Sequence, residues 1–140
     1  MGNSQSAQKI NYEDVQYVIK NTEQFILINT LPEQKQDCLI LNTVQISQEE
    51  AYINKLIKYG NKEMKIIIYG VNCNDEKMYA KYNQLLSLGF YNVYIYTGGL
   101  FEWLMLQDIY GSKDFPTTKK ELDFLKYKPN KVFGIQLLEY

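Results

Sequence analysis

Residues 66–103 read IIIYGVNCNDEKMYAKYNQLLSLGFYNVYIYTGGLFEW, and this stretch decides the fold. It begins inside the segment Lys65–Tyr69 (KIIIY), which is β-branched and apolar on both faces, as a central parallel strand is. A short loop follows, and the spacing then predicts a helix from about Asp75 to Leu88 that Gly89 ends.

The second half of the stretch repeats the order of strand and helix. Asn92–Thr97 (NVYIYT) is predicted to be a strand, and after Gly98-Gly99 a helix is predicted over Leu100–Ile109. Trp103, Leu104, Leu106 and Ile109 form its predicted apolar side. Because strands and helices alternate, we expect an α/β domain with a mainly parallel central sheet and helices on both faces.

The flanking segments extend the same pattern. Asn11 is predicted to cap a helix, with Asp14 at its third position, and Gln24–Asn29 is predicted to be a strand. The segment Cys38–Ile46 alternates well enough for a second strand at an edge of the sheet. Further on, Ser47 and Glu50 are predicted to form a capping box for a helix that ends at Gly60. Thr118 and Glu121 are predicted to cap a last short helix that ends at about Leu125. We therefore expect a flexible arm at 1–9, one domain at 10–127 and a tail at 128–140.

Two missing residue types exclude several classes of enzyme. The chain has 140 residues and a formal net charge of -1, and it contains no His and no Arg, so that all 15 basic residues are Lys. Triad hydrolases, histidine-based acid–base enzymes, most zinc sites and phosphatases that clamp phosphate with Arg each lose a required part. The charge balance gives no reason to expect a nucleic-acid partner, and Cys38 and Cys73 do not suggest a metal site or a disulfide framework. We expect no cofactor.

The stretch 66–103 resembles the rhodanese-like family. Leu88-Gly89-Phe90 and Gly98-Gly99-Leu100-x-x-Trp103 carry most of the likeness, which extends over roughly Lys9 to Gly111. The resemblance implies a three-layer fold. It also implies a sulfurtransferase site in the loop after the central strand, where a Cys directly following the strand takes up sulfur within a ring of backbone amides.

This chain departs from that motif at three places. The residue after Tyr69 is Gly70 rather than Cys, and the loop Gly70, Val71, Asn72, Cys73, Asn74, Asp75 ends in a carboxylate that opposes an anionic substrate. Where the family has an Asp-Val-Arg motif, the chain has Asn29-Thr30-Leu31. We therefore expect no catalytic residue in this loop, and interpret it as the recognition surface of a pseudoenzyme that binds a protein partner through a group that is not strongly anionic.

Cys73 supports the alternative of an active enzyme. It lies near a predicted helix start, where a thiolate is stabilised, so a divergent sulfurtransferase or a thiol redox enzyme would use it. Cys38 is interpreted as a buried small hydrophobe. Asp75 and Glu76 are interpreted as residues that complement the helix dipole, and Glu102 as a solvated side chain.

The two ends of the chain bear on where it acts. Met1-Gly2-Asn3-Ser4-Gln5-Ser6 satisfies the myristoylation pattern, with Gly2 as the acceptor, and one such chain gives only a weak, reversible membrane contact. We therefore expect a cytoplasmic protein, peripheral at a membrane, from a eukaryote or a virus of eukaryotes. The apolar tail Val132–Tyr140 supports a further alternative, a structural protein that assembles through this tail.

Overall fold

The computed structural model describes residues 7–134, and its centre is a parallel sheet of four strands. The strands are β1 (Lys9–Ile10), β2 (Phe25–Asn29), β3 (Lys65–Tyr69) and β4 (Val93–Tyr96), and they lie in the order β1-β4-β3-β2. In β2 and β3 the partners run in register from Phe25 beside Lys65 to Asn29 beside Tyr69. All four strands therefore end at the same edge of the sheet.

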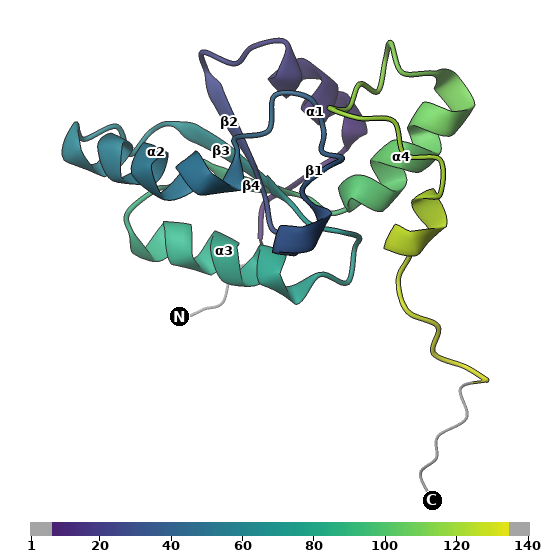
Figure 1. The fold of residues 1–140 in the computed structure, drawn as a ribbon. Coiled ribbons are helices and arrows are strands. Elements are labelled where there is room, and N and C mark those ends of the chain that lie inside the picture. Colours follow the sequence, from purple (N-terminus) through teal and green to yellow (C-terminus); the bar gives the residue numbers. More distant parts are fainter. Residues whose placement is uncertain (1–6, 135–140) are drawn as a thin grey trace, which may run out of the picture.

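Helices cover both faces of this sheet (Figure 1). One face carries α2 (Ile46–Lys58) and α3 (Glu76–Ser87), and the other carries α1 (Tyr12–Ile19) and α4 (Gly99–Tyr110). The path from β2 through β3 to β4 crosses the sheet in one direction, whereas the step from β1 to β2 goes the other way. Right-handed crossovers place the connecting helices of the two directions on opposite faces.

The strands β2, β3 and β4 divide their side chains between two apolar cores. Ile66 and Ile68 of β3 face α2 and α3, whereas Ile67 and Tyr69 face α1 and α4. Trp103 of α4 is fully buried in the core between the sheet and the helices α1 and α4. Its indole N–H donates to the carbonyl oxygen of Pro116 at 3.1 Å. The predicted α/β class and three-layer arrangement are confirmed, and so is the core role of Trp103.

Several predicted elements match closely. The strand Lys65–Tyr69 is β3, and Asn11 caps α1 with a capping box that includes Asp14. Asp75 caps α3, and its side chain accepts a hydrogen bond from the backbone amide of Lys77.

The segment before α2 differs from the prediction. Over 38–46 no strand forms; the residues make only isolated bridges, of Ile40 with Thr117 and of Thr43 with Leu27. The helix α2 begins earlier than the expected capping box, after Gln45, which makes no side-chain cap hydrogen bond. The apolar alternation of the segment instead reflects burial, because Cys38, Leu39 and Ile40 all pack into the core next to α4.

Both ends of the described chain also differ from the prediction. Lys9, expected in the flexible arm, belongs to β1 and pairs with Ile95 of β4. No helix forms at Thr118, whose hydroxyl instead accepts from the backbone amide of Leu39 and donates to the carbonyl oxygen of Asp37; a short 3₁₀ helix, η2 (Phe124–Tyr127), follows later. Ile109, expected on the apolar side of α4, is 66% exposed.

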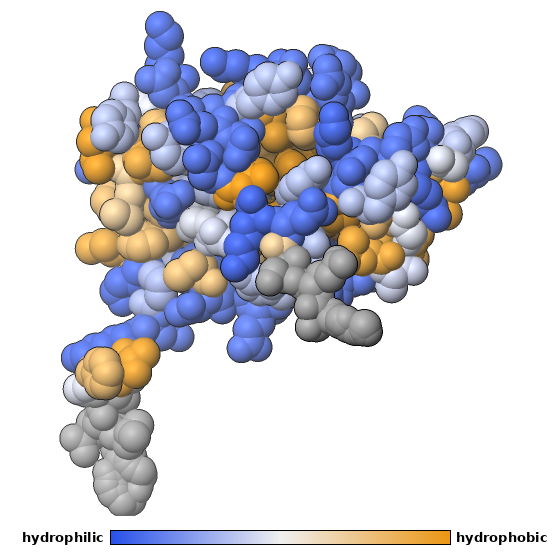
Figure 2. Space-filling view, turned by 180° about the vertical axis from the view of Figure 1, so that it is seen from behind, coloured by the Kyte–Doolittle hydropathy of each residue, from blue (hydrophilic) through white to orange (hydrophobic). Residues whose placement is uncertain are grey.

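The tail leaves the domain after η2. Val132 and Phe133 are 74% and 86% exposed, and the space-filling view shows the last described residues standing clear of the domain (Figure 2). Gly2 and residues 135–140 of the tail lie outside the described residues. Among the described residues, no helix combines the length and the apolar character that a membrane span requires.

Candidate functional site

The loop 70–75 lies at the carboxyl edge of the sheet, where open parallel sheets place their ligands. It connects β3 to α3 and is bonded to the start of α4. The carbonyl oxygens of Gly70 and Val71 accept from the backbone amides of Leu100 and Phe101, each at 2.9 Å. Two of the amides at the N-terminus of α4, which have no partner within the helix, are therefore bonded to the loop.

Gly99 makes this contact close. Its φ is +69°, and a Cβ atom on it would lie 2.8 Å from the carbonyl oxygen of Gly70 and 2.9 Å from the backbone of Asn72. Only glycine combines this backbone conformation with this approach. Gly99 thus allows α4 to begin directly against the loop.

The carboxylate of Asp75 turns back into the loop. Its Oδ2 accepts from the backbone amide of Val71 at 3.0 Å and from the hydroxyl of Thr30 at 3.1 Å, and its Oδ1 accepts from the amide of Lys77 at 2.9 Å. A Cβ atom on Gly70 would lie 2.2 Å from Oδ2 and 2.6 Å from Cγ of Asp75. The space that a side chain at position 70 would fill is therefore occupied by the Asp75 carboxylate.

Asn72 takes up further polar groups of the loop. It is buried, its Oδ1 accepts from the amide of Asn74 at 2.9 Å, and its Nδ2 donates to the carbonyl oxygen of Tyr127 at 2.8 Å. The second bond connects the loop to η2, which the sequence did not indicate. The amides of Val71 and Asn74 thus already have acceptors within the loop.

Cys73 is in the same loop but faces outward. It is exposed, and its thiol lies 3.8 Å from Oδ1 of Asn74, a weak contact. Cys38 is buried, as predicted, and its thiol donates to the carbonyl oxygen of Lys119; burial raises the pKa of the Cys38 thiol. In residues 7–134 no three His, Cys, Asp or Glu side chains gather as a metal site would require.

Glu102 is not simply solvated. Its Oε1 accepts from the hydroxyl of Tyr96 at 2.5 Å, and burial together with this carboxylate raises the pKa of the Tyr96 phenol. A Cβ atom on Gly98 would lie 2.3 Å from the same Oε1. The expectation of a solvated side chain is wrong because the start of α4 places Glu102 over the end of β4.

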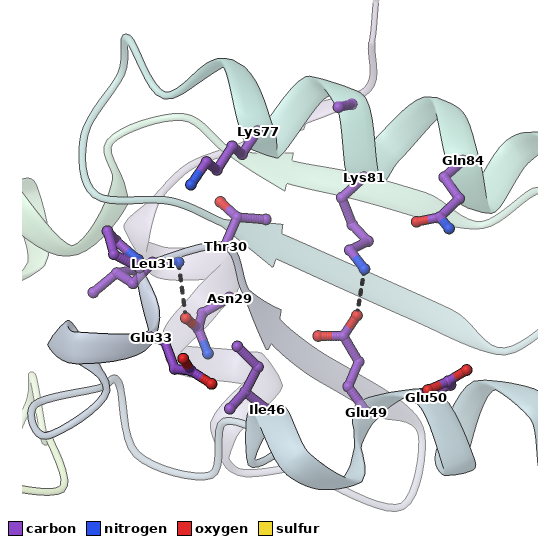
Figure 3. Close-up of a pocket in the computed structure, with 12 residues that line it drawn as sticks. Asn29, Thr30, Leu31, Glu33, Ile46, Glu49, Glu50, Lys77, Lys81 and Gln84 are labelled. Atoms are coloured by element: carbon purple, nitrogen blue, oxygen red, sulfur yellow. Dashed lines mark hydrogen bonds and ion pairs between the residues drawn. The ribbon is translucent and has the colours of Figure 1, made fainter.

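Two cavities meet at this edge of the sheet. The larger, of about 680 Å³, lies between α2 and α3 beyond the end of β2 (Figure 3). In it Lys81 of α3 forms an ion pair with Glu49 of α2 at 2.6 Å, while Lys77 extends toward the segment after β2. The smaller, of about 320 Å³, lies over the loop 70–75, and Thr30, Pro32 and Lys77 line both.

The similarity of the chain to a known family gives its class of protein. The family model described as "Rhodanese-like domain" matches residues 12–106, and the chain belongs to that family. No match is found among curated proteins.

Solved structures of the same fold come from bacteria and yeast. The rhodanese-like domain of the Alr3790 protein from Anabaena sp. shares 20% identity at a TM-score of 0.55, with 97% of this chain and 94% of that one covered. A single-domain sulfurtransferase of Saccharomyces cerevisiae shares 17% identity at a TM-score of 0.51, with 74% and 94% covered. A thiosulfate sulfurtransferase of Pseudomonas aeruginosa shares 13% identity at a TM-score of 0.56, and the match covers 71% of this chain but 19% of that one. These likenesses concern the fold.

Proposed function

We propose that this rhodanese-like domain is a non-catalytic binding module. The observation that carries the proposal is the carboxylate of Asp75, which lies where a side chain at position 70 would lie. In the sulfurtransferases that the fold resembles, the thiolate directly after the central strand attacks the outer sulfur of thiosulfate, forms a persulfide and releases sulfite. Here that position is Gly70, and the adjacent negative charge of Asp75 would oppose both a thiolate and thiosulfate.

Cys73 does not take over this role in the proposal. Its thiol faces outward, whereas the carboxylate of Asp75 holds the inner amide of Val71. A thiolate is stabilised by inward-pointing amides or nearby cations, but Cys73 does not line the cavity over the loop into which Lys77 faces, and the chain has no His or Arg to act as its base. The carboxyl edge of the sheet is then left for binding.

The test places a Cys at position 70, directly after the central strand. Gly70→Cys alone is expected to accept no sulfur from thiosulfate, because the Asp75 carboxylate stays in contact with position 70. Gly70→Cys combined with Asp75→Gly removes that charge together with all the Asp75 side-chain atoms that crowd position 70, and glycine is tolerated at the N-cap of α3. We expect only the double variant to gain the mass of one sulfur atom, and Cys73→Ser in that background to leave the gain unchanged. Equal uptake by the single and double variants would contradict the role given to Asp75.

We further propose that Gly2 is myristoylated and that the module is tethered weakly to a membrane or to a partner. The support is the sequence pattern at 1–6, since Gly2 lies outside the described residues. One acyl chain alone binds membranes reversibly. Expression in a eukaryotic cell should give a protein heavier by one myristoyl group, and Gly2→Ala should abolish the increment. An unmodified wild-type Gly2 would remove the tether.

A further inference from the structure

Four lysines surround the smaller cavity over the loop 70–75. They come from three separate parts of the chain: Lys35 from η1 (Glu33–Lys35), Lys77 from the first turn of α3, and Lys126 and Lys128 from η2 and the residue after it. The only carboxylate among the described residues that line the cavity is that of Asp75. The lining is therefore strongly positive, although the chain as a whole has a formal net charge of -1.

Most of these positive charges are not neutralised by neighbours. Within residues 7–134 the ion pairs are Lys81–Glu49, Lys119–Asp37 and Lys126–Glu121, so Lys35, Lys77 and Lys128 make none there. The Asp75 carboxylate already accepts three hydrogen bonds, one from the hydroxyl of Thr30 and two from the backbone amides of Val71 and Lys77. Like charges gathered around one hollow repel one another, and an acidic ligand relieves this repulsion.

A buried aromatic ring holds part of this arrangement in place. The Nζ atoms of Lys35 and Lys126 each lie 5.4 Å from the ring centroid of Tyr127, within the range of a cation–π interaction. Tyr127 is 2% exposed, and its carbonyl oxygen accepts from Asn72 of the loop. The same residue therefore positions two of the ammonium groups and attaches them to the loop.

We propose that this lysine-lined cavity binds an acidic segment of a partner protein. The inference deepens the proposed binding function and rests on it. This occupant is more acidic than the group expected from the sequence, because the lysines come together only in the fold. Asp75 is half-buried, whereas three of the four lysines are exposed, so carboxylates spaced along a chain can contact the ammonium groups, while a compact anion over the loop would meet the Asp75 carboxylate. The neighbouring larger cavity is also lined by Glu33, Glu49 and Glu50, so we expect the acidic segment to lie over the smaller cavity alone.

The experiment measures the binding of a labelled peptide of alternating Glu and Gly residues to the full chain by fluorescence anisotropy. A peptide with Gln in place of Glu is the matched probe. We expect the Glu peptide to bind and added salt to weaken it, because the contacts are between charges. Lys35→Gln and Lys128→Gln should each weaken binding about three- to tenfold, in line with the loss of one charge contact at a partly exposed site.

Two further variants sharpen the result. Lys113→Gln removes the same charge from an exposed position that lines neither of the two cavities, and should leave binding unchanged. Glu121→Gln removes the partner that lies 2.8 Å from Lys126, and should tighten binding because Lys126 then becomes available to the peptide.

Four outcomes would overturn the proposal. They are absence of peptide binding, equal binding of the Gln peptide, an equal loss in Lys113→Gln and Lys35→Gln, and competition by inorganic phosphate at the peptide's own concentration, which would indicate a site for compact anions. Absence of peptide binding together with absence of sulfur transfer would reject this inference and leave the non-catalytic assignment standing. Sulfur transfer by the wild-type chain would reject that assignment instead.

Discussion

Tyr69, the last residue of β3, shows how a single buried hydroxyl connects the sheet to the irregular segment before α2. The ring is fully buried, and its oxygen accepts from the backbone amide of Ile40 at 3.1 Å and lies 2.7 Å from the hydroxyl of Thr43. The apolar run KIIIY predicted the strand, but no pattern in the sequence indicated this phenol as the anchor of 38–45. A hydrogen bond over 29 residues of separation leaves no local signal.

Tyr69→Phe is expected to destabilise the fold by about 1–3 kcal/mol at neutral pH, because the buried amide of Ile40 loses its acceptor. Burial raises the pKa of Tyr69 well above its ordinary value. Above about pH 10 the phenol therefore ionises in the unfolded chain but not in the folded one, which favours unfolding. The stability difference between wild type and Tyr69→Phe should narrow as the pH rises past that value. Urea unfolding across the pH range measures it, and a difference that grows with pH would contradict the argument.

Gly99→Ala tests the close contact between α4 and the loop. The added Cβ would meet backbone atoms at 2.8 and 2.9 Å and would also sit at a positive φ, so we expect a loss of about 3 kcal/mol or more. Gly60→Ala is the matched control, since its φ is +73° but no atom lies within 4 Å of the added Cβ. It should lose only about 1–2 kcal/mol. If thermal unfolding shows the same loss of stability for Gly99→Ala and for the control, the close contact between Gly99 and the loop does not contribute to stability.

At the scale of elements, prediction worked where local patterns decide the structure. The apolar strand Lys65–Tyr69 and the Asn11 cap are local, and both are confirmed. The predictions for the start of α2 and for the segment at Thr118 are wrong. At Thr118 tertiary contacts override the capping pattern, because its hydroxyl bonds to Leu39 and Asp37, some 80 residues away in sequence. The connection between the loop and η2 is equally non-local.

Asn72→Ala is expected to loosen η2 from the loop. The variant loses the 2.8 Å bond to the carbonyl oxygen of Tyr127, so the amides of Lys126 and Lys128 should exchange hydrogen faster. The whole domain should lose about 1–2 kcal/mol. Asn74→Ala, whose side chain is exposed, is the control and should leave this exchange unchanged. Equal protection of η2 in the two variants would show that the bond does not hold it.

For the whole molecule, the predicted class of fold is confirmed, whereas the side chains that gather at the candidate site could not be predicted from the sequence. Gly70 and Asp75 were singled out from the resemblance, yet their contact in space depends on how the loop turns back. The gathering of Lys35, Lys77, Lys126 and Lys128 was missed, because three segments far apart in sequence supply them. No pattern of spacing along one segment could have indicated it.

The exposed tail allows a prediction for the molecule as a whole. Phe133 is 86% exposed, so Phe133→Ser should change the free energy of unfolding by no more than about 0.5 kcal/mol. Chemical denaturation measures this change. A loss of several kcal/mol would mean that the tail packs on the domain or on a second copy, and size-exclusion chromatography of the two proteins would distinguish those cases.

The central claim, that the domain binds without catalysing sulfur transfer, is tested most directly by the intact mass of the wild-type protein after incubation with thiosulfate and then with an alkylating reagent. The account predicts that the exposed Cys73 is alkylated as a plain thiol and that no sulfur atom is added. A species heavier by one sulfur atom, and lost in Cys73→Ser, would contradict the account and identify Cys73 as the sulfur acceptor.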